Sequence, residues 1–261
     1  MSEHGIHPQA VVAASAKLGP RVKVGPYAII SENVELGEGC VVHAHAVIQG
    51  PAVIGRENIF HPFCVIGGDP QDLKFHGEHT ELIIGNGNTF REYVTVSRGT
   101  VGGGAKTTIG NGSLFMAYSH IAHDCHVGKD TIFANGATLA GHVTVEDFAT
   151  IGAFSPVHQF CRIGRYAYVG ASTVITQDVT PFSRVVTERS TKSYGLNSIG
   201  LERKGFTKER LQSLQRAYRL LLQSKMNTSQ AVAAMRERFG ASPDVQELVR
   251  FIEAAERGIV K

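Results

Sequence analysis

The sequence lacks the features of a membrane-spanning or exported protein. No run of about 18 apolar residues occurs among its 261 residues, so we expect no transmembrane helix. The start, Met1-Ser2-Glu3-His4-Gly5, has no charged head followed by an apolar run, which predicts no secretory signal and a cytoplasmic location. The formal net charge is +3, and no nucleic-acid partner is expected.

What the sequence has instead is an aliphatic or aromatic residue at every sixth position through most of its first 180 residues. These residues are Ile6, Val12, Leu18, Val24, Ile30, Leu36, Val42, Ile48, Ile54, Phe60, Ile66, Ile84, Phe90 and Val96, and then, one residue out of phase, Ile109, Phe115, Ile121, Val127, Phe133, Leu139, Val145, Ile151, Val157, Ile163, Val169 and Ile175. This period is the signature of a parallel β-helix, with three hexads in each coil. Glycine often follows the recurring residue, and we expect it to supply the backbone angles of a sharp corner.

Cysteine is scarce, and its few copies fit the same repeat. Cys40, Cys64, Cys125 and Cys161 each lie four residues after a recurring apolar residue. Because free cysteine packs well as a small hydrophobe, we predict four interior side chains rather than a metal site or disulfides.

The hexads stop near Val179, and a helical period follows. We predict helices that begin after a cap at Thr207, near Thr228, and after a cap at Ser242. The expected organisation is a β-helix domain, a connector and a C-terminal α-helical domain, at residues 1–180, 181–196 and 197–261.

Charge differs between the two ends of the chain. Residues 1–196 hold 14 Lys and Arg against 16 Asp and Glu, whereas residues 197–261 hold 12 against 7. This net charge of +5 in the C-terminal region predicts a docking surface for an acidic partner, with a merely solvated helix surface as the alternative.

Two interruptions and a group of histidines mark a candidate site. Residues 69–80 and 99–106 do not follow the hexad, and loops that leave a rigid scaffold often carry function. With these loops set aside, Ile66, Val96, Ile121, Leu139 and Val157 fall on one face of the prism. The same face should carry His123, His142 and His158 on successive coils, within several ångströms of one another.

Several segments resemble the UDP-N-acetylglucosamine acyltransferase family. They are His120-Ile121-Ala122-His123-Asp124-Cys125, Leu139-Ala140-Gly141-His142, Val157-His158-Gln159-Phe160, Gln71-Asp72-Leu73-Lys74, Arg98-Gly99-Thr100 and Gly200-Leu201-Glu202-Arg203-Lys204-Gly205-Phe206. The resemblance covers essentially the whole chain. It implies a left-handed β-helix and a homotrimer with active sites between subunits. It also implies transfer of an (R)-3-hydroxyacyl group from acyl carrier protein to the 3-hydroxyl of UDP-N-acetylglucosamine, the first step of lipid A biosynthesis, without metal or cofactor.

The resemblance also assigns roles to individual residues. His123 corresponds to the general base, Asp124 to the carboxylate that orients it, and the Gly141 amide to the oxyanion donor. Substrate binding falls to Gln71, Asp72, Lys74, His120, His142, His158, Gln159, Asn197 and Arg203. A histidine base suits the reaction, because a sugar hydroxyl is a poor nucleophile at neutral pH and must lose its proton as it attacks.

The sequence leaves three questions of identity open. Ser97 and Ile199 depart from the pattern common in the family, so the acceptor position is a hydroxyl or an amine. Ala171 stands where glycine is common, and the acyl-chain length is not fixed. The competing interpretations are an N-acyltransferase of the same superfamily, whose extra N-terminal domain is not expected here, a zinc enzyme like the γ-carbonic anhydrases, and a non-catalytic solenoid.

Overall fold

The chain forms two compact units, which are described separately below. The computed structural model describes residues 5–187, 193, 195–255 and 259. One unit comprises Met1–Thr187 and the other Glu188–Lys261. Within the described residues, no helix has the length and apolar character needed to cross a membrane.

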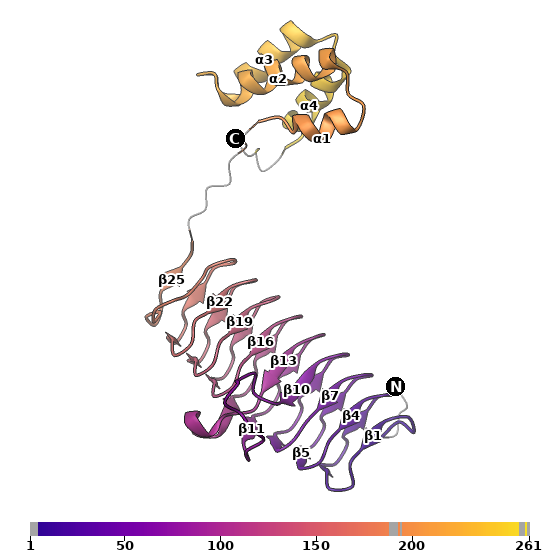
Figure 1. Cartoon of the computed structure of the whole chain (residues 1–261), viewed down its shortest axis with the longest axis vertical. Helices are drawn as coiled ribbons and strands as arrows, with labels where there is room; N and C mark the ends of the chain where they lie inside the picture. The colour runs from indigo at the N-terminus through magenta and orange to yellow at the C-terminus, as the bar shows by residue number, and fades with distance from the viewer. Residues whose placement is uncertain (1–4, 188–192, 194, 256–258, 260–261) are drawn as a thin grey trace. The chain divides into compact units, whose positions relative to one another are not determined.

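The first unit is a parallel β-helix built from three sheets, as predicted (Figure 1). The first sheet contains β1 (Val11–Val12), β4 (Ile29–Ile30), β7 (Val47–Ile48), β10 (Val65–Gly68), β13 (Thr95–Ser97), β16 (His120–Ile121), β19 (Thr138–Leu139) and β22 (Pro156–Val157). The second contains β2 (Lys17–Leu18), β5 (Val34–Leu36), β8 (Ala52–Ile54), β11 (Glu81–Ile84), β14 (Lys106–Ile109), β17 (His126–Val127), β20 (Thr144–Val145) and β23 (Arg162–Ile163). The third contains β3 (Lys23–Val24), β6 (Val41–Val42), β9 (Ile59–Phe60), β12 (Thr89–Phe90), β15 (Leu114–Phe115), β18 (Ile132–Phe133), β21 (Thr150–Ile151), β24 (Tyr168–Val169) and β25 (Arg184–Val185).

Consecutive strands belong to different sheets, so each coil contributes one strand to each face and pairs with the coils on either side. The expected face is confirmed, because Ile66 pairs with Val96, which pairs in turn with Ile121. The same column continues to Leu139 and Val157. The strand β25 lies within the segment expected to be a connector and pairs with β24.

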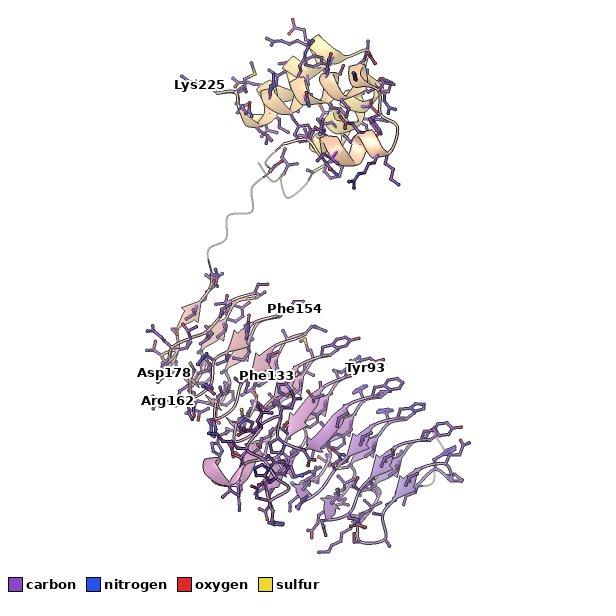
Figure 2. All side chains as sticks on the ribbon, in the orientation of Figure 1. Tyr93, Phe133, Phe154, Arg162, Asp178 and Lys225 are labelled. Atoms are coloured by element: carbon purple, nitrogen blue, oxygen red, sulfur yellow. The ribbon has the colours of Figure 1, made fainter. Side chains whose placement is uncertain are left out.

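The interior is filled by the recurring hexad residues. Phe60, Phe90, Phe115 and Phe133 are fully buried and stack on one another with ring centroids 4.8–5.2 Å apart. All four cysteines are free and buried, as predicted. Figure 2 shows Phe133 inside the coil, whereas Tyr93 and Phe154 project from its edge.

The role expected for the corner glycines was wrong in one respect. Gly19, Gly37 and Gly152 do not adopt positive φ, and the left-handed position falls two residues later in the corner, as at Tyr27 and Asp124. A Cβ on Gly37 would instead lie 2.5 Å from the backbone carbon of Gly55 in the next coil. These glycines are therefore needed for close stacking of coils rather than for a special backbone conformation.

The second unit is a small helical domain. Its helices are α1 (Ser198–Arg203), α2 (Lys208–Leu222), α3 (Thr228–Phe239) and α4 (Pro243–Glu253). The predicted cap of α2 is confirmed, since the Thr207 side chain accepts a hydrogen bond from the Arg210 amide. Ser242 precedes α4, with Pro243 at its first position, but makes no side-chain cap bond. The sequence did not predict α1, which is only six residues long.

Candidate active site

The candidate residues of the first unit gather at one corner of the β-helix, where chain passes from the first sheet to the second. The loop 69–80 connects β10 to β11, and residues 98–105 connect β13 to β14. On the next coils, His123 and Asp124 lie between β16 and β17, and Gly141 and His142 between β19 and β20. Parallel register therefore places both loops and both histidines on neighbouring coils, as the periodicity predicted.

His123 and Asp124 form a hydrogen-bonded pair at this corner. The His123 Nδ1 atom lies 2.8 Å from Oδ2 of Asp124. Because a carboxylate oxygen accepts, Nδ1 is the donor, and in the neutral ring Nε2 then keeps its lone pair. The His123 side chain is 13 % exposed and that of Asp124 only 1 %. The pair thus presents one basic nitrogen, Nε2, while the other ring nitrogen donates to a buried carboxylate. This is the arrangement that a general base requires.

The loop at 98–105 surrounds the Asp124 carboxylate, a feature that the sequence did not predict. The Thr100 amide donates to Oδ1 at 2.7 Å and the Thr100 hydroxyl donates to Oδ2 at 2.6 Å. The Asp124 amide in turn donates to Oγ1 of Thr107 at 2.8 Å. A Cβ built on Gly103 would overlap the carboxyl group of Asp124. The triple-glycine run was recognisable as a loop, but its contact with Asp124 depends on the fold.

His142 lies beside His123, as predicted. Their rings meet edge to face, with centroids 5.1 Å apart. The Nδ1 atom of His142 is 3.8 Å from Oδ2 of Asp124, too far for a hydrogen bond. On its other side the His142 ring stacks on Phe160, with centroids 4.5 Å apart. The Asp124 carboxylate therefore accepts a hydrogen bond from His123 and not from His142, while stacking on Phe160 fixes the plane of the His142 ring.

Gly141 lies directly against the His123 ring. A Cβ at position 141 would be 2.6 Å from Cε1 and 2.8 Å from Nε2 of His123. Among the described residues no acceptor bonds to the Gly141 amide. The equivalent position of other corners holds Pro20, Pro26 or Pro62, which have no amide hydrogen to give. The corner geometry thus leaves this amide unbonded, and the sequence places it beside the candidate base.

His120 lies on β16 and is partly buried. Its Nδ1 atom lies 2.7 Å from Oγ1 of Thr95 on the neighbouring strand. Burial, with a smaller effect from His123, lowers the pKa of His120. A neutral His120 is therefore favoured beside the candidate base.

The first loop shares a pocket with His142. A cavity of about 290 Å³ is lined by Asp72, Lys74, Phe75, Glu78, Thr100, Val101, Gly102, His142 and Phe160. The Lys74 amide donates to the Asp72 carboxylate at 3.0 Å, which folds the loop on itself. The Arg98 guanidinium donates to the Gly67 carbonyl and pairs with Asp69, so it ties the two loops together. The pocket brings together three of the predicted binding residues, Asp72, Lys74 and His142.

Other predicted residues are less closely connected to this pocket. The exposed His158 ring bonds to the carbonyl of Gln159 at 3.2 Å, and Phe160 rather than His158 contacts His142. Gln71 is exposed in the first loop. Asn197 and Arg203 belong to the second unit, where Asn197 caps α1 by accepting from the Gly200 amide. Of the two departures from the family pattern, Ser97 is buried on β13 and Ile199 is exposed on α1.

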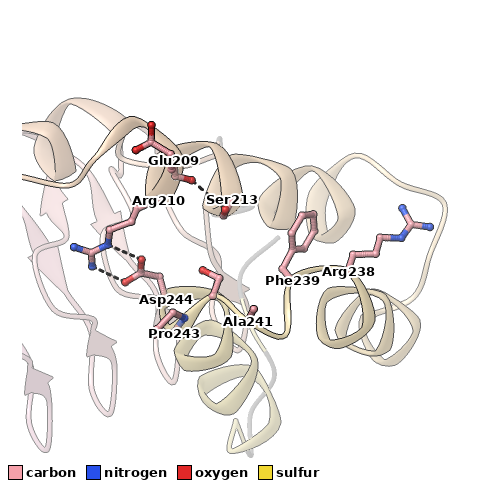
Figure 3. Close-up of a pocket in the computed structure, with 9 residues that line it drawn as sticks. Glu209, Arg210, Ser213, Arg238, Phe239, Ala241, Pro243 and Asp244 are labelled. Carbon is pink, nitrogen blue, oxygen red and sulfur yellow. Dashed lines mark hydrogen bonds and ion pairs between the residues drawn. The ribbon is translucent and has the colours of Figure 1, made fainter.

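The second unit has a pocket of its own, shown in Figure 3. This cavity of about 500 Å³ lies between α2 and the start of α4, and a bidentate pair of Arg210 with Asp244 at 2.7–2.8 Å forms one wall. The pair lowers the pKa of Asp244 through the hydrogen bonds from Arg210. Its lining contains none of the residues predicted for the site.

His123, Asp124 and His142 also present one potential metal-ligand atom each, within 4.8 Å of one another. The Oδ2 atom of Asp124 already accepts from both His123 and the Thr100 hydroxyl. The Asp124 oxygen that a zinc ion would need is therefore already engaged by His123 and Thr100, and the ion would have to displace at least one of these two bonds.

Comparison with protein families agrees with the hexapeptide repeat. Residues 15–50, 33–68 and 106–141 match a family model described as bacterial transferase hexapeptide (six repeats). A β-helix built of such repeats is that of a hexapeptide-repeat transferase. Residues 178–260 match the model of the second domain of UDP-N-acetylglucosamine O-acyltransferase.

Several relatives match essentially the whole chain. The acyl-[acyl-carrier-protein]–UDP-N-acetylglucosamine O-acyltransferase of Xylella fastidiosa is 50 % identical over 100 % of both chains. That of Alkalilimnicola ehrlichii is 55 % identical over 98 % of this chain and 99 % of its own. The crystal structure of UDP-N-acetylglucosamine O-acyltransferase from Moraxella catarrhalis covers 98 % of this chain and 99 % of its own, with 38 % identity and a TM-score of 0.69. The chain belongs to the acyl-[acyl-carrier-protein]–UDP-N-acetylglucosamine O-acyltransferase family.

Proposed function

We propose that this protein transfers an (R)-3-hydroxyacyl group from acyl carrier protein to the 3-hydroxyl of UDP-N-acetylglucosamine, as the first step of lipid A biosynthesis. The names of the relatives support the donor, the acceptor and the O-acyl product. The observation that carries the proposal is the His123–Asp124 pair, because its arrangement leaves one basic nitrogen at the mouth of a loop-lined corner.

In the proposed reaction, His123 acts as general base. Its Nε2 atom takes the proton of the sugar hydroxyl as the oxygen attacks the thioester carbonyl. The carbonyl oxygen gains negative charge and accepts a hydrogen bond from the Gly141 amide. The intermediate collapses with loss of the thiolate of acyl carrier protein, which takes the proton back from His123. A general base of this kind contributes roughly 10²–10⁴-fold to the rate, and an oxyanion donor roughly 10²–10³-fold.

Binding of the acceptor is assigned to the loop-lined cavity. Lys74 supplies a cation for the phosphates of the UDP-sugar, while Asp72 and the histidines offer acceptors and donors for its hydroxyls. His158, Gln159 and Gln71 extend this surface, and Asn197 and Arg203 contact the nucleotide or the donor. The O-acyltransferase names of the relatives favour a hydroxyl over an amine as the acceptor group.

We also assign a homotrimer to the functional form. Tyr27, His45, Phe63, Tyr93 and Tyr118 stack along the corner between the third and first sheets, with centroids 4.9–5.3 Å apart. Val11, Ile29 and Val174 are exposed on or beside the first sheet, which lies between this corner and the His123 corner. A second copy that covers this apolar face would also form the second wall of the site.

An acyl-transfer assay tests the proposal directly. Purified protein is supplied with acyl carrier proteins of several chain lengths and with both the 3-hydroxy and the 3-amino UDP-sugars. Transfer to UDP-N-acetylglucosamine that falls at least about 100-fold in a folded His123→Ala variant would support the reaction and the base. Transfer only to the 3-amino UDP-sugar would show that the acceptor group is an amine and not a hydroxyl. About one zinc per subunit in metal analysis would favour the carbonic-anhydrase alternative.

A further inference from the structure

The glycine-rich loop at 98–105 donates more hydrogen bonds to the Asp124 carboxylate than the His123 ring does. Thr100 donates to both carboxylate oxygens, one through its amide and one through its hydroxyl. Thr100 and Asp124 are both buried, at 8 % and 2 % exposure, so water does not readily substitute for these bonds. A hydrogen bond to a buried charged group stabilises more than one on the surface.

The loop also excludes other positions for this carboxylate. Gly103 approaches so closely that even a methyl group there would overlap Asp124. The Gly103 amide donates to the Thr100 carbonyl at 3.0 Å, which closes the turn above the carboxylate. Arg98 anchors the start of the loop, because its amide bonds to Gly68 and its guanidinium to Gly67.

The position of the Asp124 carboxylate determines which histidine can donate a hydrogen bond to it. Its Oδ2 atom is 2.8 Å from Nδ1 of His123 but 3.8 Å from Nδ1 of His142. Rotation of the carboxylate toward His142 would break the bond from the Thr100 hydroxyl, which is 2.6 Å long and ends on the same oxygen.

We propose that Thr100 is a positioning residue, which holds Asp124 against His123 and thereby keeps the proton of His123 on Nδ1. The inference rests on the proposed function for its catalytic consequence. Thr100 does not touch the reacting atoms in this role; it acts through Asp124. Gly103 contributes by leaving the space that the carboxylate occupies.

Steady-state kinetics of Thr100→Val test this role. Valine keeps the size and the amide bond but removes the hydroxyl donor, so kcat should fall about 10-fold or more. The KM values for both substrates should stay within about two-fold of the parent. Thr100→Ser, which keeps both donors, should recover most of the lost kcat. Thr108→Val is a matched control, because Thr108 also bonds to a histidine, His126, at 2.9 Å but lies outside the site.

A double-mutant cycle separates positioning from a general structural role. In an Asp124→Asn background the charged acceptor is gone, and Thr100→Val should then cost less than about two-fold in kcat. Full additivity of the two effects would overturn the proposal. A rise in KM for the UDP-sugar with unchanged kcat would also overturn it, since Thr100 would then be a substrate contact.

A measurement that needs no turnover distinguishes this proposal from the proposed function. Protein labelled with ¹⁵N-histidine should show a His123 Nδ1–H signal, assigned by its loss in His123→Ala. Thr100→Val should move or broaden this signal, and Thr100→Ser should largely retain it. Absence of acyl transfer in the parent protein would refute the function alone, whereas an unchanged His123 signal in Thr100→Val would refute the role of Thr100.

Discussion

Gly141 and His123 are in direct contact across two successive coils, with the space for a Cβ at position 141 only 2.8 Å from Nε2 of the imidazole. The nitrogen proposed as the base and the amide proposed as the oxyanion donor are therefore neighbours. The proposed chemistry requires this, because the attacking oxygen and the carbonyl it attacks must lie within about 3.5 Å of each other.

Gly141→Ala is accordingly expected to impair catalysis. The added methyl group would displace the His123 ring or block the approach to Nε2, so kcat/KM should fall roughly 100-fold. Gly68→Ala provides a comparison, since the nearest atoms to a Cβ at that position are 3.5 Å and 3.8 Å away, at ordinary contact distance. The Gly141 variant should lose far more activity at equal thermal stability; equal activity of the two variants would contradict the contact.

The apolar first sheet predicts a trimer in solution. Light scattering at micromolar concentration should give three times the chain mass of 28.1 kDa. Tyr93→Glu, which places a charge in the stacked column, should weaken association, because burial of an unpaired charge is costly. The control Val53→Glu changes a residue of similar exposure on the second sheet. A monomer for the parent protein would remove the second wall of the proposed site.

Reversal of two cations in the second unit should weaken capture of the acidic acyl carrier protein. Arg203 ends α1 and Lys204 follows it. The double variant Arg203→Glu and Lys204→Glu should raise the KM for acyl carrier protein, and the parent KM should rise with salt because screening shortens the reach of these charges to about 10 Å. Lys225→Glu serves as a control on the same unit. A rise confined to the KM for the UDP-sugar would instead assign Arg203 to the nucleotide.

Burial of His120 predicts a dependence of stability on pH. Its pKa is lowered in the folded protein, so the unfolded chain binds a proton at this residue more readily. Above about pH 6.5, the ordinary pKa of histidine, His120 should not lower the free energy of unfolding. Below that pH the free energy of unfolding should decline, because the unfolded chain takes up a proton at His120 more readily than the folded protein does. Urea unfolding at several pH values should show a shallower decline for His120→Asn than for the parent. The exposed His126→Asn is the control, and equal slopes for all three proteins would contradict the prediction.

The sequence predicted the β-helix, its faces and the corner that carries the site, because a strict period of six leaves little freedom in register. It also predicted that His123 and His142 are neighbours, since Ile121 and Leu139 lie one coil apart. The partners of Asp124 were not predictable in the same way. Thr100 and Gly103 lie outside the hexad pattern, and their contact with Asp124 depends on how an irregular loop folds.

The glycines show a second limit of sequence reasoning. A glycine repeated at each corner is compatible with either a special backbone angle or a close approach, and the sequence does not distinguish the two. The structure assigns positive φ to residues such as Tyr27, Asp124 and His142, and close approach to glycines such as Gly37. The short helix α1 was missed because six residues are too few to show a clear helical period.

The strand order of the first sheet has a consequence for the way the molecule loses structure. In a stack of coils each layer is held only by its neighbours, so opening is expected to spread inward from the free edges. The candidate corner extends over β10, β13, β16 and β19, and β1, β4 and β7 precede these strands in the sheet. Fraying that begins at β1 must therefore cross three coils before it reaches β10, where the corner begins, and five before it reaches β16, which precedes His123. Amide exchange with solvent water should therefore be faster in the N-terminal coils than at the corner around His123.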